Sequence, residues 1–77
     1  MSIWASVCKW GARELGDCLN DSGYSSDDIV SARFEALNMS RQATFSIVYR
    51  DDNEEAGFGQ GLIYVWLENS GALTASF

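Results

Sequence analysis

Six consecutive apolar residues, Leu62–Leu67, restrict the fold of this chain more than any other feature of its sequence. Successive side chains of a β-strand point to opposite faces of a sheet, so this segment is apolar on both faces. Such a pattern is typical of a central strand. The fold should therefore contain a β-sheet, and both faces of that sheet need cover at this strand.

Two further strands flank this segment in the sequence. Residues 42–50 alternate apolar and polar side chains, which predicts a half-buried strand. The segment between the two strands, DDNEEAGFGQG, is predicted to be a mobile loop that is acidic and rich in glycine. After residue 67, Asn69-Ser70-Gly71 supplies a tight turn into a last strand over residues 72–77.

Residues 29–37 fit two interpretations. Apolar and polar side chains alternate strictly over residues 30–36, which is the period of a strand. The preceding Ser26-Asp27-Asp28, however, is typical of a helix start, and some of the apolar residues also fit a helical stripe. We interpret the segment as a strand and keep the helix as the alternative.

Residues 3–19 repeat apolar side chains at helical spacing and predict one amphipathic helix. Its apolar stripe consists of Trp4, Cys8, Leu15, Cys18 and Leu19. Within one helix the two cysteines lie about 15 Å apart along the axis, which is too far for a disulfide. We expect both to be small buried hydrophobic residues in a reducing compartment.

Together these elements predict an α+β fold, with an N-terminal helix packed on a four-stranded antiparallel sheet in meander order. Two helices followed by three strands is the alternative. A chain of 77 residues has room for a single small domain, residues 1–77. One helix layer covers only one face of the sheet, so a second apolar face should remain open for association. We expect a homodimer that forms through Ile63, Val65 and Leu67.

The charge balance indicates the class of partner. Eleven acidic residues stand against five basic ones, and with no histidine the formal net charge is −6. A field of this sign repels nucleic acid and membrane surfaces and attracts basic proteins. The chain is 47% hydrophobic, well above the content of a disordered acidic tail, so it should fold. With no apolar run long enough for a bilayer and no signal-peptide pattern, we expect a cytosolic protein.

The motifs that could carry chemistry are incomplete. The glycines of residues 57–61 precede a strand, whereas a phosphate-binding loop follows a strand and opens a helix. The acids of residues 51–55 are contiguous and lack the alternating ligand positions of a calcium-binding EF-hand. Two cysteines without histidine are too few ligands for zinc, and no nucleophile–base arrangement is present. We therefore predict no enzymatic activity, no metal and no cofactor.

The acidic residues form clusters, and an aromatic residue lies beside each cluster. Aromatic anchors inside a charged rim are typical of protein–protein interfaces. The three aromatic residues, which we expect to be exposed, are Trp10, Tyr24 and Phe58. The predicted partner-binding residues are Asp27, Asp28, Asp51, Asp52, Glu54, Glu55, Trp10, Glu14 and Asp17.

In size, composition, acidic clusters and helix-plus-sheet pattern, the chain resembles the small acidic inhibitors that bacteriophages make against host defence enzymes, such as anti-CRISPR proteins and DNA mimics. No signature motif carries this resemblance. It implies that the carboxylates occupy the basic channel in which a nuclease or CRISPR surveillance complex of the host holds nucleic-acid phosphates. The alternative function is a small structural or assembly protein that self-associates through the open sheet face. Inhibitor binding should depend steeply on salt, whereas self-association should not.

Overall fold

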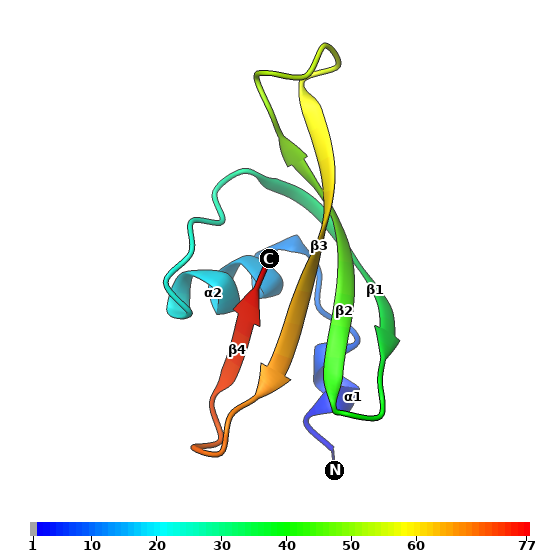
Figure 1. Ribbon diagram of the computed structural model, residues 1–77, viewed down its shortest axis with the longest axis vertical. Helices are drawn as coiled ribbons and strands as arrows, with labels where there is room; N and C mark the ends of the chain where they lie inside the picture. The colour runs from blue at the N-terminus through cyan, green and yellow to red at the C-terminus, as the bar shows by residue number, and fades with distance from the viewer. Residues whose placement is uncertain (1) are drawn as a thin grey trace.

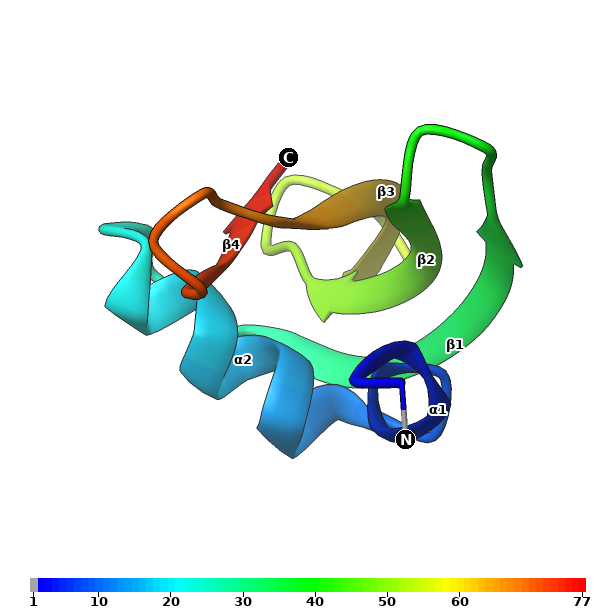
Figure 2. The ribbon, with the colours of Figure 1, turned by 90° about the horizontal axis from the view of Figure 1, so that it is seen from below.

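The computed structural model describes residues 2–77, in which four antiparallel strands form one sheet in the order β1-β2-β3-β4. Two short helices pack on one face of this sheet (Figures 1 and 2). The elements are α1 Trp4–Val7, α2 Ala12–Asp21, β1 Ile29–Leu37, β2 Gln42–Arg50, β3 Phe58–Leu67 and β4 Leu73–Ser76. The predicted α+β class and the meander order of the four strands are confirmed, and so is the interpretation of residues 29–37 as a strand.

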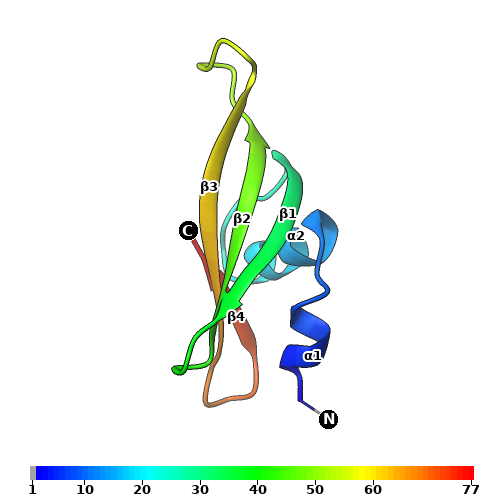
Figure 3. The ribbon, with the colours of Figure 1, turned by 90° about the vertical axis from the view of Figure 1, so that its right-hand side faces the viewer.

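The helix predicted over residues 3–19 is in fact two helices, which Figure 3 shows as separate segments. Helix α1 ends at Val7, and the backbone of Gly11 is extended (φ −101°, ψ −165°), so α2 begins only after it. The main-chain N–H of Gly11 donates to the Glu14 carboxylate at 3.4 Å, so this residue opens α2 instead. The change of direction leaves Cys8 exposed, while Cys18 is buried. The expectation of two buried cysteines is therefore correct for Cys18 and wrong for Cys8.

The core lies between the helices and one face of β2, β3 and β4. Val7, Leu15 and Leu19 enter it from the helices, and all three are fully buried. The sheet contributes Phe45, Ile63 and Val65, which are also fully buried, together with Ala43, Ile47 and Ala75. The cluster thus closes the helix-covered face against solvent.

The dimerisation surface predicted from the sequence is wrong for two of its three residues. Ile63 and Val65 are 0% exposed because they point into the helix layer. Leu67, the third, is 42% exposed at the end of β3. Alternation along β3 correctly identified two apolar faces, but the face left open carries Leu62, Tyr64 and Trp66.

The register between β2 and β3 explains which face received the helices. Phe45 pairs with Ile63 and Ala43 with Val65, so the apolar side of β2 continues directly onto this side of β3. The opposite side of β2 carries Thr44 and other polar residues. Aligning the amphipathic strand β2 with β3, which is apolar on both faces, could have predicted from the sequence which face of β3 the helices cover.

The β2–β3 hairpin extends beyond the rest of the sheet, and its far end stands clear of the helices in Figures 1 and 3. Its strands pair without a register shift from Gln42 and Trp66 to Arg50 and Phe58. Residues 58–61, which we predicted to belong to a loop, therefore lie in β3. The molecule is 42 Å long but only 23 and 18 Å across. Neither helix of residues 2–77 has the length and apolar character needed to cross a membrane.

Candidate protein-interaction surfaces

The end of the hairpin is a compact acidic turn, residues 51–57. The main-chain N–H of Asp51 donates to the Gly57 carbonyl at 2.9 Å, which closes the turn. Inside it, the N–H of Glu54 donates to the Asp51 carbonyl at 3.1 Å and the N–H of Gly57 to the Glu54 carbonyl at 2.9 Å. Gly57 has φ +80°, a conformation that glycine adopts without strain. Local hydrogen bonds thus define the shape of the turn that presents the acids.

This acidic tip comprises Asp51, Asp52, Glu54 and Glu55. Asp52, Glu54 and Glu55 are exposed, and Asp51 is half-buried. Within residues 2–77 the one ion pair lies elsewhere, between Arg33 and Glu35 at 3.8 Å. No Lys or Arg of residues 2–77 forms an ion pair with the tip, although Arg50 directly precedes it, so the four carboxylates together keep a net negative field at the end of a projecting arm.

A second acidic surface lies on α2, beside β4. Trp10, Glu14 and Asp17 line one groove of about 450 Å³ together with Asp21 and residues of β4. The structure therefore brings these three predicted residues together. Trp10 is half-buried, however, and its ring stacks on Phe45 with ring centroids 6.3 Å apart. Because the ring is engaged with the core, it is a wall of the groove and not a free anchor.

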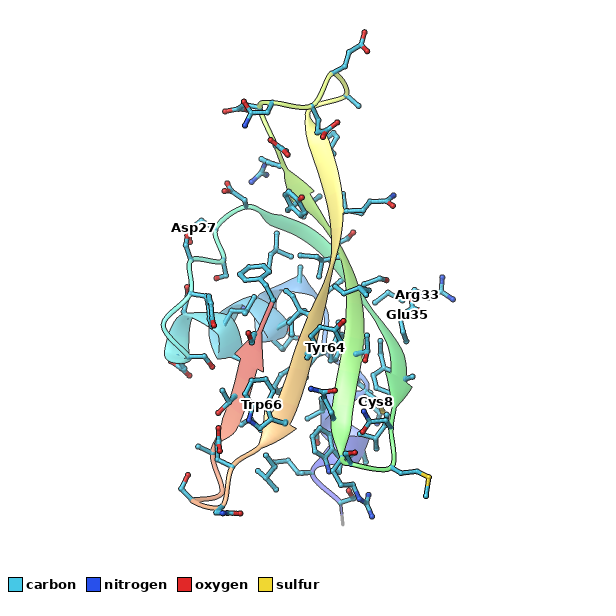
Figure 4. All side chains as sticks on the ribbon, in the orientation of Figure 1. Cys8, Asp27, Arg33, Glu35, Tyr64 and Trp66 are labelled. Carbon is cyan, nitrogen blue, oxygen red and sulfur yellow. The ribbon has the colours of Figure 1, made fainter. Side chains whose placement is uncertain are left out.

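The neighbouring acids Asp27 and Asp28 lie in different places. Asp27, labelled in Figure 4, lines a hollow of about 370 Å³ that Asp17 and Arg13 also line. The carbonyl of Asp28 accepts a hydrogen bond of 2.8 Å from the N–H of Arg50, which ties the start of β1 to the base of the hairpin. The predicted acids thus form two surfaces, the acidic tip and an α2 surface, with Asp28 between them.

The open face of the sheet is the surface that sequence reasoning placed on the wrong residues. It carries a row of apolar side chains along β3, of which Phe58 is 51% and Leu62 is 48% exposed. Tyr64 and Trp66 continue this row, as Figure 4 shows, and are half-buried. The indole N–H of Trp66 donates to the Glu68 carboxylate at 2.9 Å, which holds the ring across the sheet. Of the aromatic residues predicted to be exposed, Tyr24 and Phe58 are, and Trp10 is not.

Cys18 lies where α2 meets β4, and its thiol donates a long hydrogen bond, 3.7 Å, to the Leu73 carbonyl. Burial and then the negative charge of Asp21 raise the pKa of this thiol, and a hydrogen bond with Ser22 opposes them. A thiol with a raised pKa is a weak nucleophile and a weak metal ligand at neutral pH. Its place in the fold is that of a buried hydrophobic residue.

Among the described residues, no three Cys, Asp or Glu side chains are grouped so that they could hold a metal ion. Comparison with known proteins found no matching protein family, no matching curated protein and no matching solved structure. The candidate sites described above are the acidic tip, the α2 surface and the open sheet face.

Proposed function

We propose that this chain is a small acidic inhibitor that binds a basic nucleic-acid-binding surface of a host protein, such as a nuclease or a CRISPR surveillance complex, and does so with its acidic tip. The target class would place its action in the host cytosol. The observation that supports this most directly is the position of the tip. Four carboxylates without a cation partner among residues 2–77 lie at the end of an arm that stands clear of the helices (Figure 1).

The dimensions of the arm suit a channel that holds nucleic acid. A slender hairpin can enter a groove that a rounder domain of the same charge could not. Its contiguous carboxylates would then take the place of successive phosphates against lysine and arginine side chains. Exposed charges of this kind act mainly on the association rate, which falls as salt shortens the Debye length from about 10 Å at 0.1 M to about 3 Å at 1 M.

The test measures inhibition of DNA cleavage by a panel of purified host-defence nucleases, including RNA-guided ones. The tip variant carries Asp51→Asn, Asp52→Asn, Glu54→Gln and Glu55→Gln. The matched control carries Glu14→Gln, Asp17→Asn, Asp21→Asn and Asp27→Asn. Both variants remove four negative charges, so a difference between them reports the position of the charge and not its total.

We expect the parent to inhibit at least one nuclease, with an affinity that falls as salt rises. Four exposed ionic contacts of about 0.2–1 kcal/mol each correspond to a loss of roughly fourfold to several hundredfold in affinity for the tip variant. The control variant should lose much less affinity than the tip variant, because the charges it removes lie away from the arm. Equal inhibition by the parent and the tip variant at low salt, or no inhibition of any nuclease in the panel, would contradict the proposal.

A second candidate function is self-association into a structural or assembly unit through the open sheet face. The observation that favours it is the apolar row along β3, in which Phe58 and Leu62 are about half exposed. Gln60 separates Phe58 from the rest of the row, but Leu62, Tyr64 and Trp66 follow one another on the same face, and an apolar run of this kind is typical of association surfaces. The two functions differ in their response to salt, because salt weakens contacts between opposite charges and leaves apolar contacts in place.

A further inference from the structure

The sheet has three stretches of free strand edge, and two of them are protected. The outer edge of β4 is covered by the end of α2, where the N–H of Ala75 donates to the Ser22 hydroxyl at 3.0 Å. The outer edge of β1 is interrupted by two register shifts, between Ile29 and Ser31 and between Phe34 and Ala36. Caps and bulges are the ordinary means by which proteins block the addition of a further strand.

The third stretch, residues 58–63 of β3 (the upper half of this strand), has neither a cap nor a register shift. β4 pairs only with Tyr64–Leu67, so Phe58–Ile63 has β2 on one side and no strand of residues 2–77 on the other. Figures 1 and 3 show β4 beside the lower part of β3 alone. The pairing of this half with β2 has no bulge. A straight strand edge of this kind is a template for a further strand.

The hydrogen-bond pattern identifies the main-chain groups that face outward. The N–H of Asp51 donates to Gly57 on the β2 side, and the N–H of Glu68 donates to Ala72 on the β4 side. Hydrogen-bonded pairs alternate along antiparallel strands, so odd residues of β3 pair with β2 and even residues face away from it. Tyr64 and Trp66 satisfy these outward groups with β4.

The even residues of the upper half, Phe58, Gln60 and Leu62, present their N–H and C=O groups to the open edge. They offer an added strand of about five residues, roughly 17 Å long, a regular ladder of backbone partners. No side chain of residues 2–77 donates to or accepts from these backbone groups, in contrast to the cap that Ser22 provides on β4.

An apolar cleft lies on the helix side of this edge. It has a volume of about 440 Å³ and its lining includes Ile47, Tyr49, Gly61 and Phe77, with Asp28 at its wall. Opposed residues on neighbouring strands share a face, so an added strand would point every second side chain to the helix side, toward the Tyr49 ring that covers Gly59 and toward Gly61, which lines the cleft. Gly61 has no side chain that would fill the cleft. The edge therefore offers backbone partners together with a place for apolar side chains.

We propose that the upper edge of β3 accepts an extended segment of the basic partner as a fifth, antiparallel strand, with alternate apolar side chains in the cleft. The inference rests on the proposed function, because it describes how the partner of the acidic tip is held. An antiparallel segment would run its C-terminal end past Phe58 toward the tip. Basic residues at that end would therefore meet Asp51, Asp52, Glu54 and Glu55.

Charge decides between a basic segment and a second copy of this chain. Edge-to-edge pairing of two copies along residues 58–62 would bring a second chain of net charge −6 to the edge that leads to the acidic tip. Like charges in such positions oppose association, whereas a basic segment is attracted by the same carboxylates. The occupant that fits both the edge and its surroundings is a strand with alternating apolar residues and a basic C-terminal end.

The probe for the test is the synthetic peptide acetyl-Thr-Val-Thr-Val-Thr-Val-Lys-Lys-Lys-amide. We expect it to slow amide hydrogen exchange at Phe58, Gln60 and Leu62 and to shift their NMR resonances. Valines would enter the cleft, so the threonine amides would face β3. N-methylation of the three threonine amides removes up to three hydrogen bonds and should weaken binding at least about tenfold. N-methylation of the valine amides is the matched control and should leave most of the affinity.

A protein variant provides the second test. Gln60→Pro removes one outward N–H without removing a hydrogen bond to β2, and Gln60→Thr changes the side chain alone. Proline is tolerated at such an edge position. We expect Gln60→Pro to weaken peptide binding about fivefold or more through the lost hydrogen bond, and Gln60→Thr to bind like the parent. If Gln60→Pro fails to fold, the N-methylated peptides on the parent protein still decide.

Several results would overturn the inference. The inference would be overturned if both sets of methyl groups weakened binding equally, or if the peptide protected β1 in place of β3. It would also be overturned if two copies of this chain paired edge to edge along residues 58–62 without peptide. Failure of the proposed function has a different signature. If the tip variant inhibits nucleases as well as the parent while the peptide still protects Gln60, the inhibitory role of the tip fails and the strand-accepting edge stands. If the tip variant loses inhibition and the peptide protects nothing at β3, the inhibitory role of the tip stands and the strand-accepting edge fails.

Discussion

The two cysteine thiols of this chain differ in exposure, since Cys8 directly follows α1 and Cys18 lies within α2. Cys8 is exposed, whereas Cys18 is buried between α2 and β4. Burial, and after it the charge of Asp21, raises the pKa of the Cys18 thiol above its ordinary value. The folded state therefore favours the protonated thiol more strongly than the unfolded state does.

The sign of the pH dependence follows from this difference. The contribution of the Cys18 thiol to the free energy of unfolding is fully present below its unfolded-state pKa of about 8.5. It is lost as pH rises toward the higher folded-state pKa. We expect Cys18→Val to reduce the decline in the free energy of unfolding between neutral and alkaline pH, measured by urea denaturation. Cys8→Val is the matched control and should decline like the parent. Identical pH profiles for all three proteins would show that the thiol of Cys18 is not shielded.

Helix α2 and strand β4 are joined through one hydroxyl group. The Ser22 hydroxyl donates to the Cys18 carbonyl at 2.8 Å and accepts from the N–H of Ala75 at 3.0 Å. Ala75 is fully buried and its N–H faces away from β3, so the hydroxyl is its hydrogen-bond partner. This hydrogen bond satisfies an outward-facing N–H of β4, a strand of only four residues.

Removal of the Ser22 hydroxyl should lower the free energy of unfolding. Ser22→Ala leaves a buried N–H without its partner, and we expect a loss of about 1–3 kcal/mol in the free energy of unfolding by urea denaturation. Ser25→Ala removes an exposed hydroxyl and should stay within about 0.5 kcal/mol of the parent. Hydrogen exchange at Ala75 should become faster in Ser22→Ala. A stability equal to that of Ser25→Ala would mean that water replaces the hydroxyl at no cost.

Among the elements, those whose pattern repeats over many residues could be predicted from the sequence. Strict alternation predicted β2 with its observed bounds, and the same pattern predicted β1. The glycines of β3 could not be placed in this way, because glycine weakens a strand unless a neighbour covers it. Here the Tyr49 ring covers Gly59, where an added Cβ would lie 2.6 Å from the ring. A contact across the hairpin depends on register, which local pattern does not contain.

The assignment of surfaces failed in part for a related reason. A helical stripe in residues 3–19 was identified, but α1 ends at Val7 and α2 begins only after the extended backbone of Gly11, and Cys8, which follows α1, is exposed. Of the acidic residues predicted to bind a partner, Asp51 is half-buried and the others are exposed. Their division between the tip and the α2 surface could not be predicted, because it depends on how far the hairpin extends beyond the helices (Figure 1).

At the scale of the whole molecule, charge and apolar surface are separated. The tip lies at one end, and Glu14, Asp17 and Asp21 lie on the helix side of the sheet. The open sheet face carries the apolar row of β3, with Glu68 bound to Trp66 and with Glu35 paired with Arg33. Two copies that meet through this face would therefore keep most of their carboxylates apart. The face is the part of the surface on which self-association meets the least repulsion.

The predicted homodimer is accordingly expected to form through the open face. We expect light scattering at micromolar concentration to give twice the monomer mass of 8.5 kDa. Dimerisation should strengthen as salt rises, because salt screens the repulsion between two chains of charge −6 and leaves apolar contacts in place. Leu62→Lys should dissociate the dimer, since it places a charge in the centre of the apolar row. Leu67→Lys changes an equally exposed leucine at the end of β3 and should not. A mass near 8.5 kDa for the parent at every salt concentration would remove self-association as a function of this face and leave its apolar row as ordinary exposed surface.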